Sequence, residues 1–304
     1  MDKRDLLRKI STFPLAARDM AEDLLAGEFT SVFRGQGMEF DEVRRYEAGD
    51  DVRRIDWNVS ARFGTPYVKL YREEREISLC LVLDCSASMH TGSQALSRYE
   101  QGVLAAALLA FSAERTGQRV GAVFFAEDIT RVFRAGKGRQ HIMAVLSAAL
   151  DARPAGKGSG LGKALEGTAR LLRARHFRRN SPRSLVAVIS DFMCIGWERE
   201  MAALCAGHDV IAIRLVDPAD LEMGDAGLVS LEDNETGHRL YAATSFRSFR
   251  EPWAAWHGER ARLWQAVCRR WGAAALPLST AEDAVPVLAR FFRNQGAALM
   301  RRRG

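Results

Sequence analysis

The chain has 304 residues and a mass of 33.8 kDa, enough for one large domain or two small ones. Apolar residues make up 47% of it, which is ample for a hydrophobic core. No apolar run approaches the roughly 20 residues needed to cross a membrane, and the N-terminus leads into no signal-peptide core. The five cysteines are scattered without CxxC spacing, so we expect buried, reduced thiols in a cytoplasmic protein.

The net charge of +6 comes mostly from arginine. Six arginines gather between residues 170 and 183 with no acid among them, and three more lie at residues 301–303. Such patches can bind nucleic acid or an acidic protein surface. No aromatic stacking platform or DNA-binding motif accompanies them, so a solvated helix face is the favoured interpretation and nucleic-acid binding the less favoured one.

The N-terminal quarter holds two kinds of sequence. Residues 1–30 are amphipathic helical material, broken at Pro14 and closing near Gly27. Residues 39–75 alternate acids and bases densely, with aromatic side chains between them and no regular period, so we expect short strands and turns. We interpret the segment as a structural cap, in which Asp56 and Trp57 are structural and the tryptophan is buried. The alternative is a surface that docks a partner.

From residue 77 onward, strand and helix patterns alternate. Strands are predicted at 77–83, 119–126, 129–134, 184–191, 208–216, 229–232, 239–242 and 273–278, and helices at 98–116, 138–150, 161–175, 249–271 and 284–293. This alternation predicts an α/β fold, a mostly parallel sheet with helices on both faces. The spacing of Trp253, Trp256, Trp264 and Trp271 predicts one helix face packed on that sheet.

The strand at 77–83 is apolar throughout and stops at Asp84. Ser86 and Ser88 follow at alternate positions and can point their hydroxyls the same way as the carboxylate, and we expect Ser86 to face solvent. One carboxylate and two hydroxyls form a hard-oxygen site suited to Mg²⁺ or Mn²⁺ and not to zinc. The competing interpretation is a capping turn, in which a serine satisfies the N–H groups of a following helix.

A second apolar strand also ends in a carboxylate, Asp191. Ligands of α/β proteins bind at the carboxyl ends of the strands, where both aspartates would meet. The flexible loop 155–162 lies between the two strands in sequence and can supply a third hydroxyl, that of Ser159. The same loop matches neither a P-loop nor a nucleophile elbow, because Lys157 and Ala164 stand at positions those motifs give to other residues.

This set of residues resembles the metal-ion-dependent adhesion site of von Willebrand factor A domains. The resemblance implies a metal site made by Asp84, Ser86, Ser88, Ser159 and Asp191, with a serine where that family usually has threonine. The order of segments from about residue 77 to 278 also fits a von Willebrand factor A-like, Rossmann-like fold.

The preceding segment, from Arg34 to Trp57 and on to Arg62, closely resembles the bacterial "domain of unknown function 58" family, in which such a signature precedes a von Willebrand A-like domain. We therefore divide the chain into residues 1–76, a helical and signature segment packed on the main domain, and residues 77–304, the von Willebrand factor A-like domain. The resemblance also implies a MoxR-type AAA+ ATPase as partner.

The sequence is therefore interpreted as a metal-dependent protein-interaction module and not an enzyme. Two carboxylates and three neutral hydroxyls leave a divalent cation with an open position, which favours an acidic side chain of a partner. The alternative is a Mg²⁺-dependent hydrolase that uses metal-activated water at the same site. No catalytic base stands out in the sequence to support it.

Overall fold

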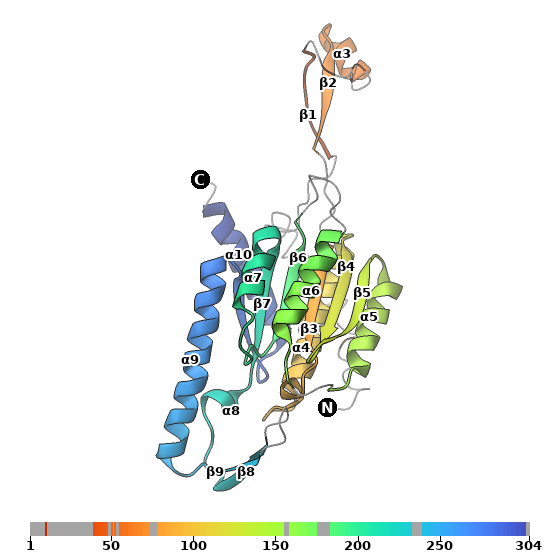
Figure 1. The fold of residues 1–304 in the computed structure, drawn as a ribbon. Coiled ribbons are helices and arrows are strands. Elements are labelled where there is room, and N and C mark those ends of the chain that lie inside the picture. The colour runs from red at the N-terminus through yellow and green to blue at the C-terminus, as the bar shows by residue number, and fades with distance from the viewer. Residues whose placement is uncertain are drawn as a thin grey trace.

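The computed structural model describes residue 10 and residues 39–47, 50, 52, 55–72, 78–154, 158–174, 183–232 and 239–301. Within these ranges, strands and helices alternate after an N-terminal hairpin (Figure 1). The strands are β1 (Glu39–Arg45), β2 (Tyr67–Arg72), β3 (Ser78–Asp84), β4 (Arg119–Phe125), β5 (Ile129–Gly136), β6 (Leu185–Ser190), β7 (Asp209–Val216), β8 (Leu228–Glu232), β9 (Arg239–Ala243) and β10 (Ala274–Ser279). The helices are α3 (Trp57–Phe63), the 3₁₀ turn η2 (Ala87–His90), α4 (Arg98–Arg115), α5 (Arg139–Asp151), α6 (Leu161–Ala174), α7 (Glu198–Gly207), α8 (Pro218–Leu221), α9 (Arg247–Trp271) and α10 (Ala284–Arg301).

Six strands form the central sheet in the order β10-β7-β6-β3-β4-β5. All neighbouring pairs are parallel except β4 and β5, which form an antiparallel hairpin. The chain enters at β3, extends to β4 on one side and later returns to β6 on the other. The strand order therefore changes direction at β3. Such a topological switch point is where ligands bind in open α/β sheets.

Strand β3 contributes side chains to two hydrophobic cores, one on each face of the sheet. Leu79, Leu81 and Leu83 face the core beneath α4, α5 and α10. Cys80 and Val82 face the opposite core, beneath α6, α7 and α9. Because alternate side chains of a strand point to opposite faces, both sets must be apolar, and this explains the continuous apolar run. The predicted α/β fold, a mostly parallel sheet with helices on both faces, is confirmed.

Helix α4 follows the candidate site and is buried nearly all round. It begins with a capping box in which Ser97 and Glu100 satisfy each other's backbone N–H groups. A Cβ added to Gly102 would lie 3.1 Å from the Ile189 side chain, so the glycine lets the helix approach β6 closely. The helix therefore holds the carboxyl ends of β3 and β6 in a fixed arrangement.

The predicted strands and helices after residue 77 are all present, within a few residues at each end except α10, which runs on to Arg301. The short elements η2 and α8, and the helices α3 and α7, were not predicted. The helical segment expected at residues 1–30 lies outside the described residues, apart from Ile10. The five cysteines are free, as expected, and Cys80, Cys85 and Cys268 are buried. None of the described helices combines the length and the apolar character needed to cross a membrane.

The prediction that four tryptophans form one packed face of α9 is wrong for two of them. Trp264 is buried, and its ring contacts Phe192. Trp253 is half-buried and donates its indole N–H to the carbonyl of Ala219 over 3.0 Å. Trp256 and Trp271, however, are 47% and 42% exposed. The helical spacing of the tryptophans predicted the side of α9 on which they lie. It did not predict how far along α9 the rest of the domain covers that side.

The N-terminal hairpin pairs β1 with β2, and α3 packs against β2. Asp56 is buried and caps α3, since its carboxylate accepts the N–H groups of Asn58 and Val59. The expectation that Trp57 is buried is wrong: its side chain is 69% exposed, and Phe63 in the same helix is 66% exposed. Because α3 packs on one side only, its first and last residues face outward.

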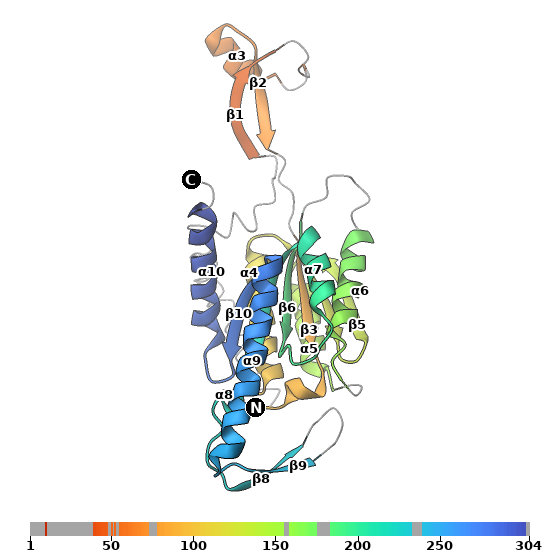
Figure 2. The ribbon, with the colours of Figure 1, turned by 60° about the vertical axis from the view of Figure 1, so that its left-hand side comes forward.

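Both views place the hairpin beyond the end of the sheet where β3 begins, opposite the end that carries α8 and the β8–β9 hairpin (Figures 1 and 2). The packing of the whole 1–76 segment on the main domain stays a prediction, because most of that segment lies outside the described residues.

Asp56→Ala should destabilise this hairpin and α3 more than Trp57→Ala does, although the tryptophan side chain is the larger of the two. Loss of the cap should cost about 1 kcal/mol and speed amide hydrogen exchange at Asn58 and Val59. Loss of the exposed indole should change stability by less than about 0.5 kcal/mol. Hydrogen exchange of α3 and chemical denaturation of both variants provide the measurement. Faster exchange in Trp57→Ala than in Asp56→Ala would contradict this account.

Candidate metal centre at the carboxyl edge of the sheet

Two carboxylates lie at the ends of neighbouring parallel strands. Asp84 is the last residue of β3, and Asp191 directly follows β6. The two strands pair in register up to Leu83 and Ile189, so both chains leave the sheet side by side. Asp84 is fully buried and Asp191 is 4% exposed. The fold thus brings together the two aspartates that the sequence predicted would meet.

A network of hydroxyl and amide donors surrounds the Asp84 carboxylate. Its Oδ1 atom accepts the N–H of Ser86 over 2.9 Å. Its Oδ2 atom accepts the hydroxyls of Ser159 over 2.9 Å and Ser190 over 2.7 Å. The hydroxyls of Ser86 and Ser88 lie 3.2 Å apart. Four of the five predicted residues are therefore linked through hydrogen bonds in one cluster.

Ser190 joins the cluster without having been predicted. Its hydroxyl donates to Asp84 and also accepts the N–H of Phe192 over 3.1 Å. A serine at the end of an otherwise apolar, fully buried strand is the signal that could have identified it. The bond to Asp84 ties the end of β6 to the end of β3, and the bond from Phe192 orients the Ser190 hydroxyl.

Asp191 is held by the backbone that follows it. Its Oδ1 atom accepts the N–H of Met193 over 3.1 Å, and the residue between them, Phe192, has a φ of 53°. Positive φ is unfavourable for a bulky side chain, so packing must hold this turn. The Phe192 ring is buried and contacts Trp197 and Trp264. The strained turn therefore depends on the core beneath α7 and α9.

A buried arginine lies next to this turn. Arg214 of β7 is 5% exposed, and its Nε donates to the carbonyl of Asp191 over 3.2 Å. Its guanidinium also lies 5.9 Å from the Trp264 ring centroid. Arg214 therefore supplies positive charge near Asp191, which the sequence alone did not indicate.

The electrostatics of the site are unfavourable for two bare carboxylates. The pKa of Asp84 is raised to about 7: burial raises it most, the nearby charge of Asp191 also raises it, and hydrogen bonds from Ser86 and Ser190 lower it. Buried charge without compensation is costly, and a divalent cation beside both carboxylates would remove that cost.

A close backbone approach places Ser159. The N–H of the next residue, Gly160, donates to the carbonyl of Ala126 over 2.6 Å. A Cβ at Gly160 would lie only 2.0 Å from the carbonyl oxygen of Glu127. Only glycine fits here, and its contact with the end of β4 fixes the loop that carries the Ser159 hydroxyl.

The donor set fits a small oxygen-preferring cation. Carboxylates and hydroxyls are ligands for Mg²⁺ or Mn²⁺, and no nitrogen or sulfur ligand is needed. Among the described residues, no group of three or more His, Cys, Asp or Glu side chains could hold a metal ion. A metal at this site would therefore depend on the serine hydroxyls. Ser86, which we expected to face solvent, is fully buried, whereas Ser88 is only partly buried.

A cavity of about 640 Å³ opens beside the cluster. Ser88, Ser159 and Asp191 line one part of it, and residues of α8 and α9 line another. These three residues therefore face a space that another molecule can enter.

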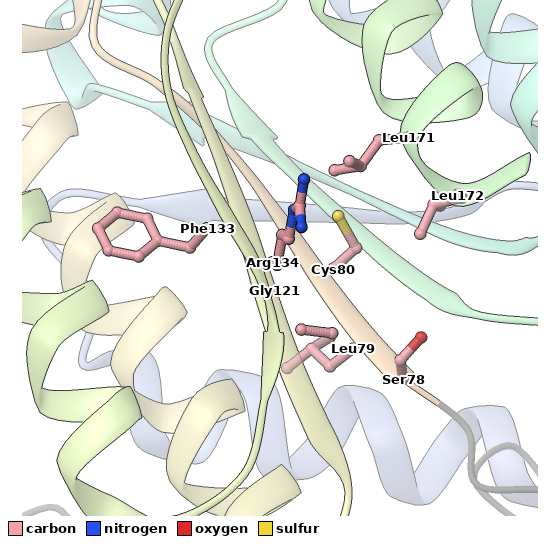
Figure 3. Close-up of a pocket in the computed structure, with 9 residues that line it drawn as sticks. Ser78, Leu79, Cys80, Gly121, Phe133, Arg134, Leu171 and Leu172 are labelled. Carbon is pink, nitrogen blue, oxygen red and sulfur yellow. The ribbon is translucent and has the colours of Figure 1, made fainter. Parts of the chain in front are cut away.

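A second cavity, of about 420 Å³, lies between the sheet and α6 (Figure 3). Leu171 and Leu172 of α6 and Cys80 of β3 contribute to its walls, together with Arg134 of β5. It contains none of the predicted site residues.

The chain matches the family model described as "Protein of unknown function DUF58" over residues 42–262. The uncharacterized protein Rv1480 of Mycobacterium tuberculosis (strain ATCC 25618 / H37Rv) is 35% identical over 240 residues, which cover 78% of this chain and 73% of that protein. The family match spans α3 and both strand-ending aspartates.

Two solved structures are similar over most of this chain. The hypothetical protein BatB from Bacteroides thetaiotaomicron is 16% identical, with a TM-score of 0.49, over 73% of this chain and 99% of that chain. A von Willebrand factor type A protein from Catenulispora acidiphila is 15% identical, with a TM-score of 0.40, over 74% of this chain and 43% of that chain.

Asp84→Asn should alter how the metal-free protein responds to pH. The pKa of Asp84 is about 7 in the folded protein against an ordinary value of 3.8. Since folding favours the protonated acid, the stability it contributes is complete below about pH 4 and is lost as the pH rises through 7. In EDTA at pH 8, Asp84→Asn should therefore melt on the order of 5 °C higher than the unmodified protein.

The control for this experiment is Asp128→Asn, which removes an exposed carboxylate that pairs with Lys163. It should leave the pH profile of melting unchanged. Equal pH profiles for Asp84→Asn and the unmodified protein would show that the buried carboxylate is already compensated.

Gly160→Ala should displace the Ser159 loop, because the new methyl group would overlap the carbonyl of Glu127. We expect a loss of about 1–3 kcal/mol and a weaker thermal response to Mg²⁺. Gly258→Ala in α9 is the matched control, since a Cβ there meets nothing within 4 Å and alanine favours helix. A Gly160→Ala protein as stable and as responsive to Mg²⁺ as the control would rule out this role for Gly160.

Proposed function

The chain belongs to the DUF58 family, and from the site at the carboxyl edge of its sheet we propose that it is a divalent-cation-dependent protein-interaction module and not an enzyme. The observation that carries this proposal is the convergence of Asp84, Ser86, Ser88, Ser159 and Asp191 beside an open cavity. The same five residues would hold Mg²⁺ or Mn²⁺.

Each part of the site has a separate role in this proposal. Asp84 is the buried anchor, and Ser190 keeps its carboxylate oriented through a 2.7 Å hydrogen bond. Ser88, Ser159 and Asp191 line the cavity, from which a partner would approach. A bound cation would supply a Lewis-acidic position that accepts an acidic side chain of that partner.

The partner we propose is a MoxR-type AAA+ ATPase or its client, acting in the assembly or maturation of a client complex. This identity follows from the family resemblance of the signature segment. An acidic residue on the partner suits the coordination of the site, because two carboxylates and three hydroxyls would leave one position of an octahedral ligand shell open. We place this activity in the cytoplasm, in line with the sequence features described above.

A Mg²⁺-dependent hydrolase built on the same residues is the alternative function. It would need a group able to activate water beside the cation. The cluster itself consists of two aspartates and several serines: the carboxylate of Asp84 accepts hydrogen bonds from serine hydroxyls, and in our proposal the aspartates would also bind the cation. The binding function needs no further chemistry, and for this reason we favour it.

Retention of a MoxR-type ATPase on the immobilised full-length protein tests the proposal. Retention should occur in Mg²⁺, be lost in EDTA, and fall about tenfold or more in Ser88→Ala and Asp191→Ala. Ser147→Ala, an exposed serine of α5, should behave as the unmodified protein. Retention that is equal in Mg²⁺ and EDTA would contradict metal-dependent binding.

The same preparations decide between module and enzyme. Neither nucleotides, phosphoesters nor peptides should be hydrolysed above the rate of an Asp84→Ala protein. Turnover that disappears in Asp84→Ala would establish the hydrolase instead.

A further inference from the structure

The cavity beside the candidate metal centre extends to a second set of side chains. Besides Ser88, Ser159 and Asp191, its walls include Trp253, Trp256 and His257 of α9. Met193 and Met223 add further apolar surface. The metal centre and this aromatic wall therefore face one continuous space, although they come from opposite ends of the domain sequence.

His257 is the unusual residue of this wall. Its side chain is 4% exposed, and neither of its ring nitrogens has a hydrogen-bond partner among the residues that the structure describes. Its ring contacts two indoles, Trp253 at 4.7 Å and Trp256 at 4.8 Å between centroids. Buried polar groups in native proteins are nearly always hydrogen-bonded, so an unpartnered buried imidazole on a cavity wall indicates a ligand.

The acidic groups nearby are already engaged. Asp217 accepts hydrogen bonds from Ser93, Ala219 and Thr280. Asp220 forms an ion pair with Arg98, which also donates to Thr91. Within the described part of the chain, the Nε atom of Arg98 is a second buried donor on this cavity without a hydrogen-bond partner. On the side of the cavity away from the candidate metal centre, the His257 ring and this N–H are therefore available to a ligand.

The protonation of His257 defines what it can bind. Burial is the main cause that lowers its pKa, and the charges of Arg214 and Arg98 lower it further, while Asp220 and Asp191 act in the opposite direction. The ring is therefore neutral at pH 7, with one nitrogen as donor and the other as acceptor. Such a ring between two indoles suits an uncharged hydroxyl carried on an aromatic ring.

We propose that this cavity binds a tyrosine of the same partner segment whose acidic residue reaches the metal centre. The tyrosine ring would pack against Trp253 and Trp256, and its hydroxyl would bond to His257. A cavity of about 640 Å³ has room for both side chains. This inference rests on the proposed function, since the acidic residue is the one that completes the cation's ligand shell.

The first test needs no partner. His257→Phe keeps a ring of similar shape and removes the two unpartnered nitrogens, so this variant should melt no lower than the unmodified protein. A clearly lower melting temperature would mean that the nitrogens already have partners within the protein, and it would overturn the inference.

The second test uses an array of synthetic twelve-residue peptides with one glutamate and, one to five residues away, a tyrosine, phenylalanine or alanine. In Mg²⁺ the full-length protein should bind glutamate–tyrosine peptides at least about tenfold more tightly than glutamate–phenylalanine peptides. His257→Phe should abolish that difference while binding to the glutamate remains.

Two tryptophans of α9 provide a matched pair of variants. Trp256 and Trp271 are 47% and 42% exposed, and each lies under an arginine, Arg260 and Arg270 respectively. Trp256→Ala should weaken the binding of glutamate–tyrosine and glutamate–phenylalanine peptides alike, whereas Trp271→Ala should leave the binding of both unchanged. Equal effects of the two substitutions would overturn the inference.

The outcomes separate this inference from the proposed function. Binding that requires glutamate and Mg²⁺ but ignores tyrosine, or that His257→Phe does not alter, overturns the tyrosine site and leaves the metal-dependent module intact. A tyrosine preference that depends on His257 but persists in EDTA and in Asp84→Ala supports the cavity and overturns the metal dependence. Absence of binding to every peptide overturns the tyrosine site.

Discussion

A fully buried carboxylate at the centre of the sheet is the constraint around which this protein is organised. Asp84 ends the strand that both hydrophobic cores share, so its charge cannot reach water. A buried charge must be hydrogen-bonded or paired. The turn after β3, the end of β6 and the loop before α6 all supply donors to it. Three separated segments are thereby held at one point.

The arrangement around Asp84 is secured by packing as much as by hydrogen bonds. The Ser159 loop depends on Gly160 lying against the end of β4. The backbone after Asp191 depends on the buried Phe192 ring. These are features of backbone and core, and they leave the hydroxyls of Ser88 and Ser159 on the wall of an open cavity. Rigid support beneath and an open face above are what a binding site requires.

The molecule has two surfaces that suit different contacts. The metal centre and its cavity lie at the carboxyl edge of the sheet, together with α8 and the first part of α9. The β1–β2 hairpin with α3 lies beyond the amino end of β3 (Figure 2). Its helix exposes Trp57 and Phe63. Exposed aromatic side chains are enriched in protein interfaces. The signature segment therefore has an exposed aromatic surface of its own, separate from the site for which we propose cation-dependent binding.

The sequence by itself determined the order of the strands after residue 77 and of the helices among them other than α7 and α8, because a buried strand must be apolar on both faces and an amphipathic helix must repeat every 3.6 residues. It also identified Asp84 and Asp191, since a carboxylate at the end of an apolar strand is conspicuous. It could not identify Ser190, Arg214 or His257, because each of them matters through residues that are close in space but distant in sequence. It also misjudged the burial of Trp57, Trp256 and Ser86. Periodicity gives the direction of a side chain, but only the tertiary structure decides whether another layer covers it, because burial depends on segments that the local sequence does not contain.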